Sequence, residues 1–454
     1  MQRNHRGNTR RLFFAAVVLP LIFTGFVRSQ YISLGTSTIH DENIFDVDSA
    51  TADRITQIHL DASQDWYFGN SSLTVAYSGS MLLFQELVAR NYHYHFLSAK
   101  MASQYYSDDE EDPSEDSTGG TDGASDSATA SGAAGAAEAK PAASPVHVDS
   151  SDQYLTFNVL GGAQFDKEAY AQYDNSLISG NVLWRQPLSR TVTFDPSYTF
   201  TYHRYPNLSG ITNTEHVGAF VLGTSAVRKS WIALTSSLGF KKYADDSYTY
   251  TYTVGHGSKA GHGKGGAGGG GGVRTQTVNL TTPSVSQILA SVDWHQNVAQ
   301  GTDFTAGVLY FGSPSSEARL LPQQRSNVLE QQINTALPAT ENEIFDDHYG
   351  YSGPLYQFGA KQSLPLAFSL SIRGLDIRKA YTIPAQQFDS AAATGGNRLD
   401  YRTEFLVNLS RPFPLGVGKS LSAELEWQYI RNDSNVPYYT FSKNTFMAGL
   451  EFNF

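Results

Sequence analysis

Apolar and polar residues alternate along most of the chain after residue 30, in segments of nine or more residues. The clearest segment is "TVTFDPSYTFTYH" at positions 191–203, where Val192, Phe194 and Tyr198 share one face. Thr193 and Asp195 fall on the opposite face with further polar residues. A period of two predicts a β-strand whose two faces meet different surroundings.

The length of these segments separates two all-β fold classes. Soluble sandwiches use strands of about five or six residues, whereas a tilted strand that crosses a bilayer needs about 9–11. The segments here reach the longer range, which favours a transmembrane antiparallel up-and-down β-barrel over a sandwich. Aromatic residues near segment ends are typical of membrane interfaces, and five are predicted to lie there: Tyr154, Trp184, Trp231, Trp294 and Trp427.

The pattern predicts about 16 strands, an even number as expected when both ends of a barrel lie on one side of the membrane. Short connections at 186–190, 227–230, 297–301 and 363–366 are predicted to be periplasmic turns. Long connections at 241–274, 313–353 and 381–397 are predicted to be extracellular. The strands are predicted to begin near Tyr31, Asp53, Ser72, Asn91, Asp152, Tyr170, Thr191, Thr214, Trp231, Thr275, Thr302, Leu355, Ala367, Arg398, Leu421 and Phe441.

Residues 1–29 are predicted to be a cleaved signal peptide, and residues 30–454 to be the barrel. An arginine-rich start precedes the 16-residue apolar run "LFFAAVVLPLIFTGFV", and small residues follow it. That order is typical of secretion signals, and the run is short for a spanning helix. An uncleaved anchor helix is the alternative. Removal of the segment would take the formal charge from −11 to −16, because it holds five arginines and no acid.

Residues 107–150 interrupt the strand pattern where a short periplasmic turn is expected. The stretch holds eleven acids and one lysine and almost no large apolar side chain. Such a composition cannot bury a core, so we expect a disordered acidic insertion in the periplasm. A miscounted strand before it is the alternative. The insertion is also a candidate contact for a periplasmic partner.

Two of the predicted loops have distinctive compositions. The 313–353 loop carries charges of both signs, so it would narrow the channel if folded inward or cover the surface if folded outward. Residues 255–272 form a glycine tract with His256 and His262. A flexible tract offers no preorganised metal geometry, and the chain has no cysteine. We therefore expect no metal site.

The polar faces of the strands are predicted to line a water-filled lumen. Acids outnumber bases among these inward positions, which predicts a weak preference for cations because charged rings select ions in pores. The alternative is that they only stabilise the barrel through cross-strand pairs. The candidate lumen residues are Asp195, Asp293, Lys361, Arg373, Asp400, Arg402, Glu404, Glu424, Glu426 and Glu451, together with Asp61, Arg185 and Lys241.

Catalysis has little support in the sequence. Four histidines are predicted to face inward near acids, which allows a His–Asp pair: His59, His95, His203 and His295. No nucleophile elbow, phosphate-binding loop or zinc-spaced histidine pair accompanies them. We expect no enzyme activity, no catalytic residue, no cofactor and no nucleic-acid partner.

The final strand carries a resemblance to a known class of proteins. Ala448, Leu450, Phe452 and Phe454 alternate up to the terminal residue, and Phe446 shares their face. The chain thereby resembles Gram-negative outer-membrane β-barrel proteins of the porin type, whose carboxy-terminal residues signal insertion. The resemblance implies contact with outer-membrane lipid and with the barrel-assembly machinery. It also implies a passive channel for small hydrophilic solutes. A non-conducting scaffold that anchors or sheathes a polymer-export or electron-transfer complex is the alternative function.

Overall fold

The computed structural model describes twelve stretches of the chain. Five predicted features fall mostly or wholly outside them: the signal peptide, the acidic insertion at 107–150, the glycine tract at 255–272, the interior of the 313–353 loop and most of the 381–397 loop. The described residues are 29–44, 51–105, 153–167, 174–207, 212–225, 229–244, 246–254, 272–280, 284–299, 301–314, 350–384 and 397–454.

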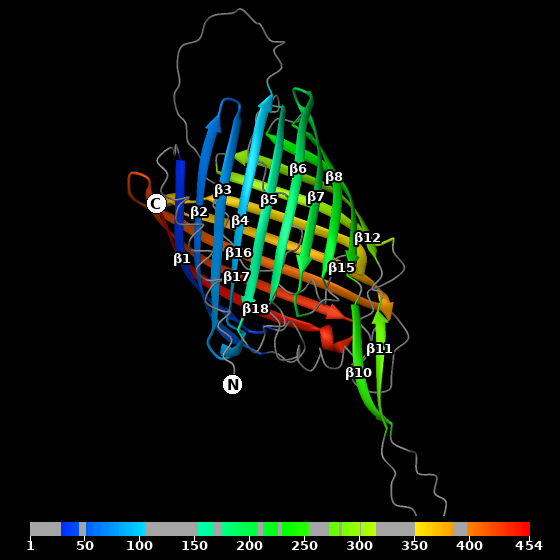
Figure 1. The fold of residues 1–454 in the computed structure, drawn as a ribbon. Helices are drawn as coiled ribbons and strands as arrows, with labels where there is room; N and C mark the ends of the chain where they lie inside the picture. The colour runs from blue at the N-terminus through cyan, green and yellow to red at the C-terminus, as the bar shows by residue number, and fades with distance from the viewer. Residues whose placement is uncertain are drawn as a thin grey trace, which may run out of the picture.

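Sixteen antiparallel strands form one closed barrel, which confirms the predicted fold class and strand number (Figure 1). Each barrel strand pairs with its neighbours in chain order, and β18 closes the ring against β1. The barrel strands are β1 (Ser29–Asp41), β2 (Asp53–Phe68), β3 (Ser71–Phe84), β4 (Tyr92–Tyr105), β5 (Gln153–Asp166), β6 (Asn175–Ser189), β7 (Val192–Arg204), β8 (Asn213–Thr224), β9 (Ser230–Tyr243), β12 (Val285–Ala299), β13 (Thr302–Gly312), β14 (Tyr351–Ser363), β15 (Ser369–Pro384), β16 (Asn397–Gly416), β17 (Lys419–Ser434) and β18 (Phe441–Asn453).

One predicted strand start is wrong. The strand expected near Thr275 belongs to a separate two-stranded sheet of β10 (Asp246–Val254) and β11 (Gly272–Leu280). This hairpin extends beyond one end of the barrel (Figure 1). The tenth barrel strand is β12, which pairs directly with β9 across the hairpin.

The connections differ between the two ends of the barrel. At one end, here the short-turn end, successive strands are joined by few residues, and the positions of the predicted short turns are confirmed at 190–191, 225–229, 300–301 and 364–368. At the other, the long-loop end, most connections are longer and β10 and β11 project. The segment between β4 and β5 is the exception, because it joins the short-turn ends of two strands across residues 106–152.

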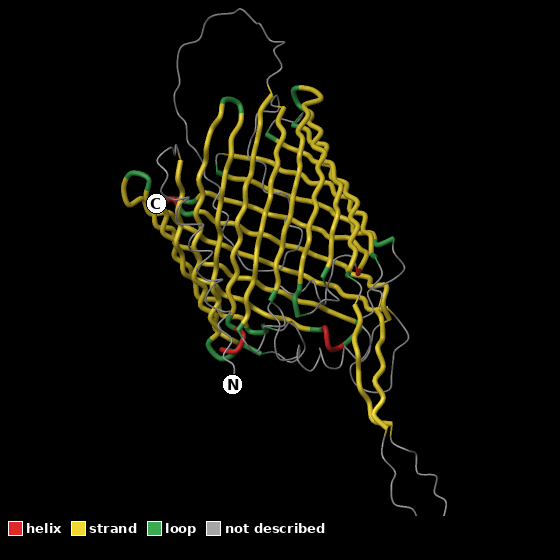
Figure 2. Tube along the Cα trace, viewed as in Figure 1, coloured by secondary structure: helices red, strands yellow, loops and turns green. Residues whose placement is uncertain are grey.

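The strands are tilted relative to the barrel axis. The strands of the near wall and those of the far wall therefore cross each other in the view of Figure 2. Strand tilt is what allows a closed sheet of this size. Closure removes every free strand edge, which satisfies the backbone groups that lipid cannot bond. At the seam, Ser33 pairs with Asn453 and Asp41 with Thr445. The backbone N–H of Phe454 donates to the carbonyl of Ile32 at 2.9 Å.

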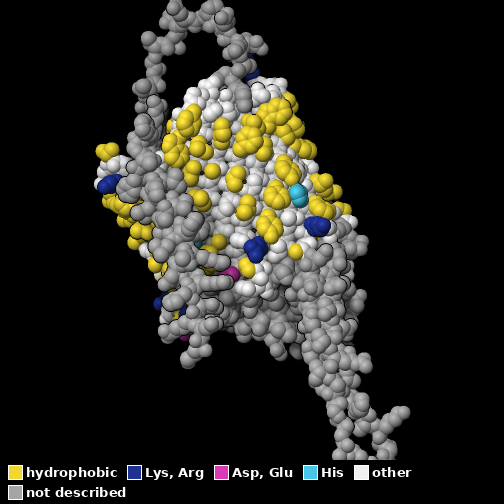
Figure 3. All heavy atoms as spheres, in the orientation of Figure 1, with side chains coloured by type: hydrophobic (Ala, Val, Ile, Leu, Met, Phe, Trp, Pro, Cys, Tyr) yellow, Lys and Arg dark blue, Asp and Glu magenta, His cyan; other side chains and the backbone are white. Residues whose placement is uncertain are grey.

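The outer face of the barrel is apolar (Figure 3). Large side chains stay about half exposed there, among them Leu34 (49%), Leu425 (58%) and Phe358 (54%). A soluble protein rarely leaves so wide an apolar surface uncovered, and lipid-facing apolar residues that alternate with inward polar ones characterise membrane barrels. Among the described residues, no helix is long and apolar enough to cross a membrane.

Three of the five predicted interface aromatics lie on this outer face, including Trp184 (43% exposed) and Trp294 (41%). The other two face inward. Tyr154 lies 4.9 Å beneath the guanidinium of Arg185 inside the barrel. Trp231 pairs with His295, another inward position. Strand ends hold aromatic residues on both faces, so a position near a strand end did not distinguish outward-facing aromatic residues from inward-facing ones.

Candidate channel lumen

Inward positions follow from the alternation of side chains along each strand. In β18, Phe446 (49% exposed) and Leu450 (51%) lie on the outer face, so Glu451, the residue after Leu450, points inward. The same alternation and the strand registers place inward all ten candidate lumen residues: Asp195, Asp293, Lys361, Arg373, Asp400, Arg402, Glu404, Glu424, Glu426 and Glu451. Their role in conduction stays a prediction.

Several inward bases are held in ion pairs with inward acids. Arg185 on β6 donates from Nε and Nη2 to both oxygens of Asp195 on β7, at 2.6–3.1 Å. Arg402 donates to Glu404 at 2.6 Å two residues along β16. Bidentate and short charge-assisted bonds of this kind are strong and neutralise both partners locally. Two more pairs lie at the long-loop end: Arg398 with Asp400, and Lys443 with Asp41.

A second set of inward acids is bonded by neutral groups only. Glu451 accepts bonds from Tyr31 Oη at 3.2 Å and Ser33 Oγ at 2.6 Å, both on β1. Glu424 and Glu426 on β17 share the amide of Asn408 on β16. In the part of the chain that the structure describes, no lysine or arginine nitrogen pairs with these three carboxylates. These three carboxylates are therefore not neutralised by a paired base in this part of the lumen wall.

Asp293 belongs to the same set and is positioned by three strands. Its oxygens accept bonds from Ser291 Oγ and from Gln357 Nε2, both at 2.8 Å. Gly307 on β13 lies between β12 and β14 in register with Asp293 and Gln357. A Cβ at that glycine would collide with both side chains. Because Gly307 has no side chain, the hydrogen bond from Gln357 on β14 to Asp293 on β12 can pass over β13.

The inward face near the short-turn end is open to solvent. Lys100, Thr305 and Lys361 point into the barrel and are nevertheless exposed. Lys361 and Arg373 have no ion pair among the described residues, so some positive charge also remains. Acids without a basic partner still outnumber such bases on this part of the inner face; besides the four above, they are Asp61 and Asp65.

The structure changes the picture of the histidines. His59, His203 and His295 face inward as predicted, and His295 Nε2 lies 3.5 Å from Asp303 rather than beside Asp293. The prediction for His95 is wrong. It pairs with Gly79 on β3 and lies on the outer face, where Tyr77 Oη approaches its Nδ1 at 2.7 Å.

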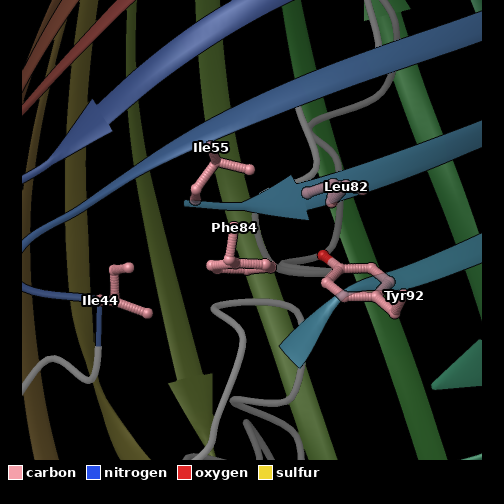
Figure 4. Packing of buried hydrophobic residues seen from close by; sticks show 5 residues of the cluster. All are labelled: Ile44, Ile55, Leu82, Phe84 and Tyr92. Atoms are coloured by element: carbon pink, nitrogen blue, oxygen red, sulfur yellow. The ribbon is translucent and has the colours of Figure 1, made fainter. Parts of the chain in front are cut away.

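Sequence reasoning missed the inner face at the long-loop end, which is partly apolar. Five residues of β1–β4 and the adjoining connection form a buried cluster inside the barrel (Figure 4), namely Ile44, Ile55, Leu82, Phe84 and Tyr92. Two further clusters lie at the same end, Phe311 with Tyr351 and Tyr381, and Tyr243 with Val285. The run "MLLF" at 81–84, apolar on both faces, was the available signal.

Buried polar groups accompany these clusters. Arg398 lies over the rings of Tyr381 (4.3 Å) and Tyr439 (3.5 Å) while it pairs with Asp400, which is 1% exposed. Asp53 accepts backbone N–H groups of the connection between β3 and β4, including those of Glu86 and Leu87 at 2.9 Å. These buried hydrogen bonds and ion pairs stabilise the packed inner face at this end, in contrast to the solvent-exposed inner face near the other end.

Comparisons with known proteins found matches among solved structures alone, all of them at low identity. No protein-family model and no curated protein matches the chain. Among solved structures, Pseudomonas aeruginosa OccK5 (OpdH) is 9% identical with a TM-score of 0.42, over 95% of this chain and 99% of that one. Pseudomonas aeruginosa OprD gives 9% and 0.42, over 95% and 96%. Acinetobacter baumannii OccAB3 gives 8% and 0.39, over 94% and 98%. Values this low transfer no substrate and no residue role.

Proposed function

We propose that the chain is an outer-membrane channel through which small hydrophilic solutes pass passively, with a weak preference for cations. The observation that carries the proposal is the inner face near the short-turn end. Glu424, Glu426, Glu451 and Asp293 are fixed there by neutral donors, whereas Arg185 is neutralised by Asp195. A fixed negative wall concentrates cations in the water beside it.

The apolar outer face supports the location. A closed barrel with this face can satisfy its backbone within lipid, and the short-turn end then corresponds to the periplasmic side of the predicted topology. The insertion signal read from Phe446, Leu450, Phe452 and Phe454 supports the same membrane. All four lie on the outer face of the final strand, which β1 closes.

Ion permeation through the purified protein in planar bilayers tests the proposal. Under a KCl gradient we expect discrete conductance steps and a reversal potential that shows K⁺ to be more permeant than Cl⁻. Replacement of the acids in a Glu424→Gln, Glu426→Gln, Glu451→Gln variant should move the reversal potential toward zero, because it removes fixed negative charge from the wall.

Asp376→Asn is the matched control, since Asp376 lies on the outer face of β15 and its loss should leave selectivity unchanged. Anion preference in the unmodified protein would contradict the selectivity. Absence of any current from correctly folded protein would contradict the channel itself and favour the non-conducting scaffold, which co-purification of a partner through residues 107–150 would then test.

A further inference from the structure

Two histidines and a tyrosine are joined on the outer face of β3 and β4, close to the long-loop end. His93 Nδ1 lies 3.0 Å from His95 Nε2, and Tyr77 Oη lies 2.7 Å from His95 Nδ1. His93 and His95 are the second and fourth residues of β4, so both lie close to the strand end, whereas Tyr77 is the seventh residue of β3. Strands of 14 residues exceed the 9–11 or so that cross a bilayer, which places strand ends in the hydrated interface.

The separation of the two ring nitrogens suits a shared metal ion. Imidazole nitrogens bind such ions at about 2.0–2.1 Å, so two cis ligands of a square-planar ion lie about 2.9 Å apart and two ligands of a tetrahedral ion about 3.3 Å apart. The observed 3.0 Å falls between these values. Residues two apart on a strand share a face, and a metal ion would replace the hydrogen bond that joins the two ring nitrogens.

Tyr77 supplies the supporting contact that metal-binding histidines usually have. A ligand histidine typically donates its other N–H to a fixed acceptor, which sets its tautomer and ring orientation. His95 Nδ1–H donating to Tyr77 Oη would make Nε2 the unprotonated nitrogen, the one that lies beside His93 Nδ1. Gly79 pairs with His95 and makes this contact possible, because a Cβ there would collide with Tyr77 Oη and press against His95 Nδ1 at 3.1 Å.

The third neighbour indicates which metal fits. Met81 on β3 is directly opposite His93 in the register, on the same outer face, and is 44% exposed. Directly opposite side chains have Cβ atoms about 5 Å apart, within reach of a thioether. Imidazole with thioether suits copper, and Cu²⁺ also binds nitrogen sites most tightly among the divalent first-row metals. Within the described stretches, no group of three or more His, Asp or Glu residues could hold a metal.

We propose that His93 and His95, supported by Tyr77 and joined by Met81, form a copper-binding site on the outer face of the barrel at its long-loop end. Water or a ligand from solution completes the coordination. The site is independent of the proposed conduction, because neither histidine faces the lumen.

Copper titration of the detergent-solubilised barrel, purified without a histidine tag, tests the site. His256→Ala and His262→Ala should be present in every variant, to remove the histidines of the glycine tract. We expect one tight Cu²⁺ per chain and an electron paramagnetic resonance spectrum with hyperfine structure from two nitrogens. His93→Ala or His95→Ala should weaken binding at least about tenfold, while folding is checked by heat-dependent migration on gels.

The β7–β8 wall offers a matched control. Tyr198 Oη lies 2.7 Å from His216 Nδ1 in the same outward arrangement, but no second histidine among the described residues bonds this pair. His216→Ala should therefore leave copper affinity unchanged. Unchanged affinity in a folded His93→Ala, His95→Ala double variant would overturn the site.

Two further variants test the neighbours. Met81→Leu should weaken Cu⁺ binding more than Cu²⁺ binding, and equal effects would overturn the thioether's role. Gly79→Ala should weaken binding of both ions while both ligands remain. Wild-type affinity in the folded Gly79→Ala protein would overturn the positioning by Tyr77.

Discussion

Arg402 and Arg431 each bond a carboxylate two residues further along the same strand, but in different surroundings. Arg402 and Glu404 point into the barrel, with side chains 11% and 9% exposed. Arg431 and Asp433 lie on the outer face, 58% and 52% exposed. Solvent screens the second pair and leaves the first to interact at low dielectric. An arginine with an acid two residues further along the strand is thus expected to stabilise the barrel strongly in one setting and weakly in the other.

Glu404→Gln is expected to lower the free energy of unfolding by about 2–4 kcal/mol, because it removes the negative charge that the Arg402 guanidinium bonds inside the barrel. Asp433→Asn, the matched change in the exposed pair, should cost no more than about 0.5 kcal/mol. Urea unfolding of the barrel refolded in micelles measures both. Equal losses in the two variants would contradict the role of burial.

Single residues also show where sequence reasoning stops. The faces of β7 were predictable because Asp195 and Thr193 alternate with large apolar residues along the whole strand. His95 was not predictable, because Tyr92 and Tyr94 alternate with the histidines and suggest the reverse assignment. Tyr92 faces an apolar cluster inside the barrel, so polarity does not distinguish the two faces at that end.

The turn between β14 and β15 carries an unusual backbone for its sequence. Leu366 and Ala367 have φ angles of 64° and 61°, a left-handed conformation that L side chains rarely adopt. Leu366 is also 72% exposed, so its side chain adds little packing. By contrast, the turn between β16 and β17 places Gly418 at a φ of 70°. Both turns contain residues with positive φ, but one uses glycine at such a position and the other uses leucine and alanine.

Leu366→Gly is expected to raise the free energy of unfolding by about 0.5–1 kcal/mol, since glycine adopts this conformation without a steric cost of about 1–2 kcal/mol. Gly418→Ala should lower it by about 1 kcal/mol for the opposite reason. The urea concentrations at the unfolding midpoints report both changes, provided that the dependence of the unfolding free energy on urea concentration is the same in all variants. A destabilised Leu366→Gly protein would show that the turn is not strained.

At the scale of elements, alternation located fifteen of the barrel strands, but it could not separate them from a projecting hairpin. The segment around Thr275 alternates as a wall strand does. Only the pairing of β9 with β12 shows that it lies outside the ring. Pairing between strands that are distant in the sequence is a tertiary property, so the local alternation of residues does not show which strands pair.

For the whole molecule, closure of the ring depends on the last strand meeting the first. The backbone of Phe454 bonds Ile32, and its ring contacts Phe452 at 4.3 Å between centroids. Closure itself was predictable, because an even number of strands with alternating short and long connections has few other arrangements. For the lumen, the sequence predicted the excess of acids over bases among the inward residues. It did not predict which of them form ion pairs, since those pairs depend on the strand register.

Deletion of Phe454 is expected to reduce the assembled fraction of the protein in the outer membrane while export across the inner membrane continues. The deletion removes the closing bond to Ile32 and the terminal ring of the predicted insertion signal. Heat-dependent gel migration of membrane fractions measures assembly. Phe454→Tyr, which keeps both the bond and an aromatic ring, should assemble normally. Full assembly of the deletion variant would show that the terminal residue is dispensable.

The pairing of β9 with β12 has a consequence for engineering. Their register runs from Lys241 with Val285 to Ser230 with Gln296, whatever the chain does between the two strands. β10 and β11 therefore take no part in the strand pairing of the barrel wall. A foreign peptide exchanged for residues 246–280 would be displayed beyond the long-loop end, on a cell surface if the proposed topology holds, without a change in the number or order of barrel strands.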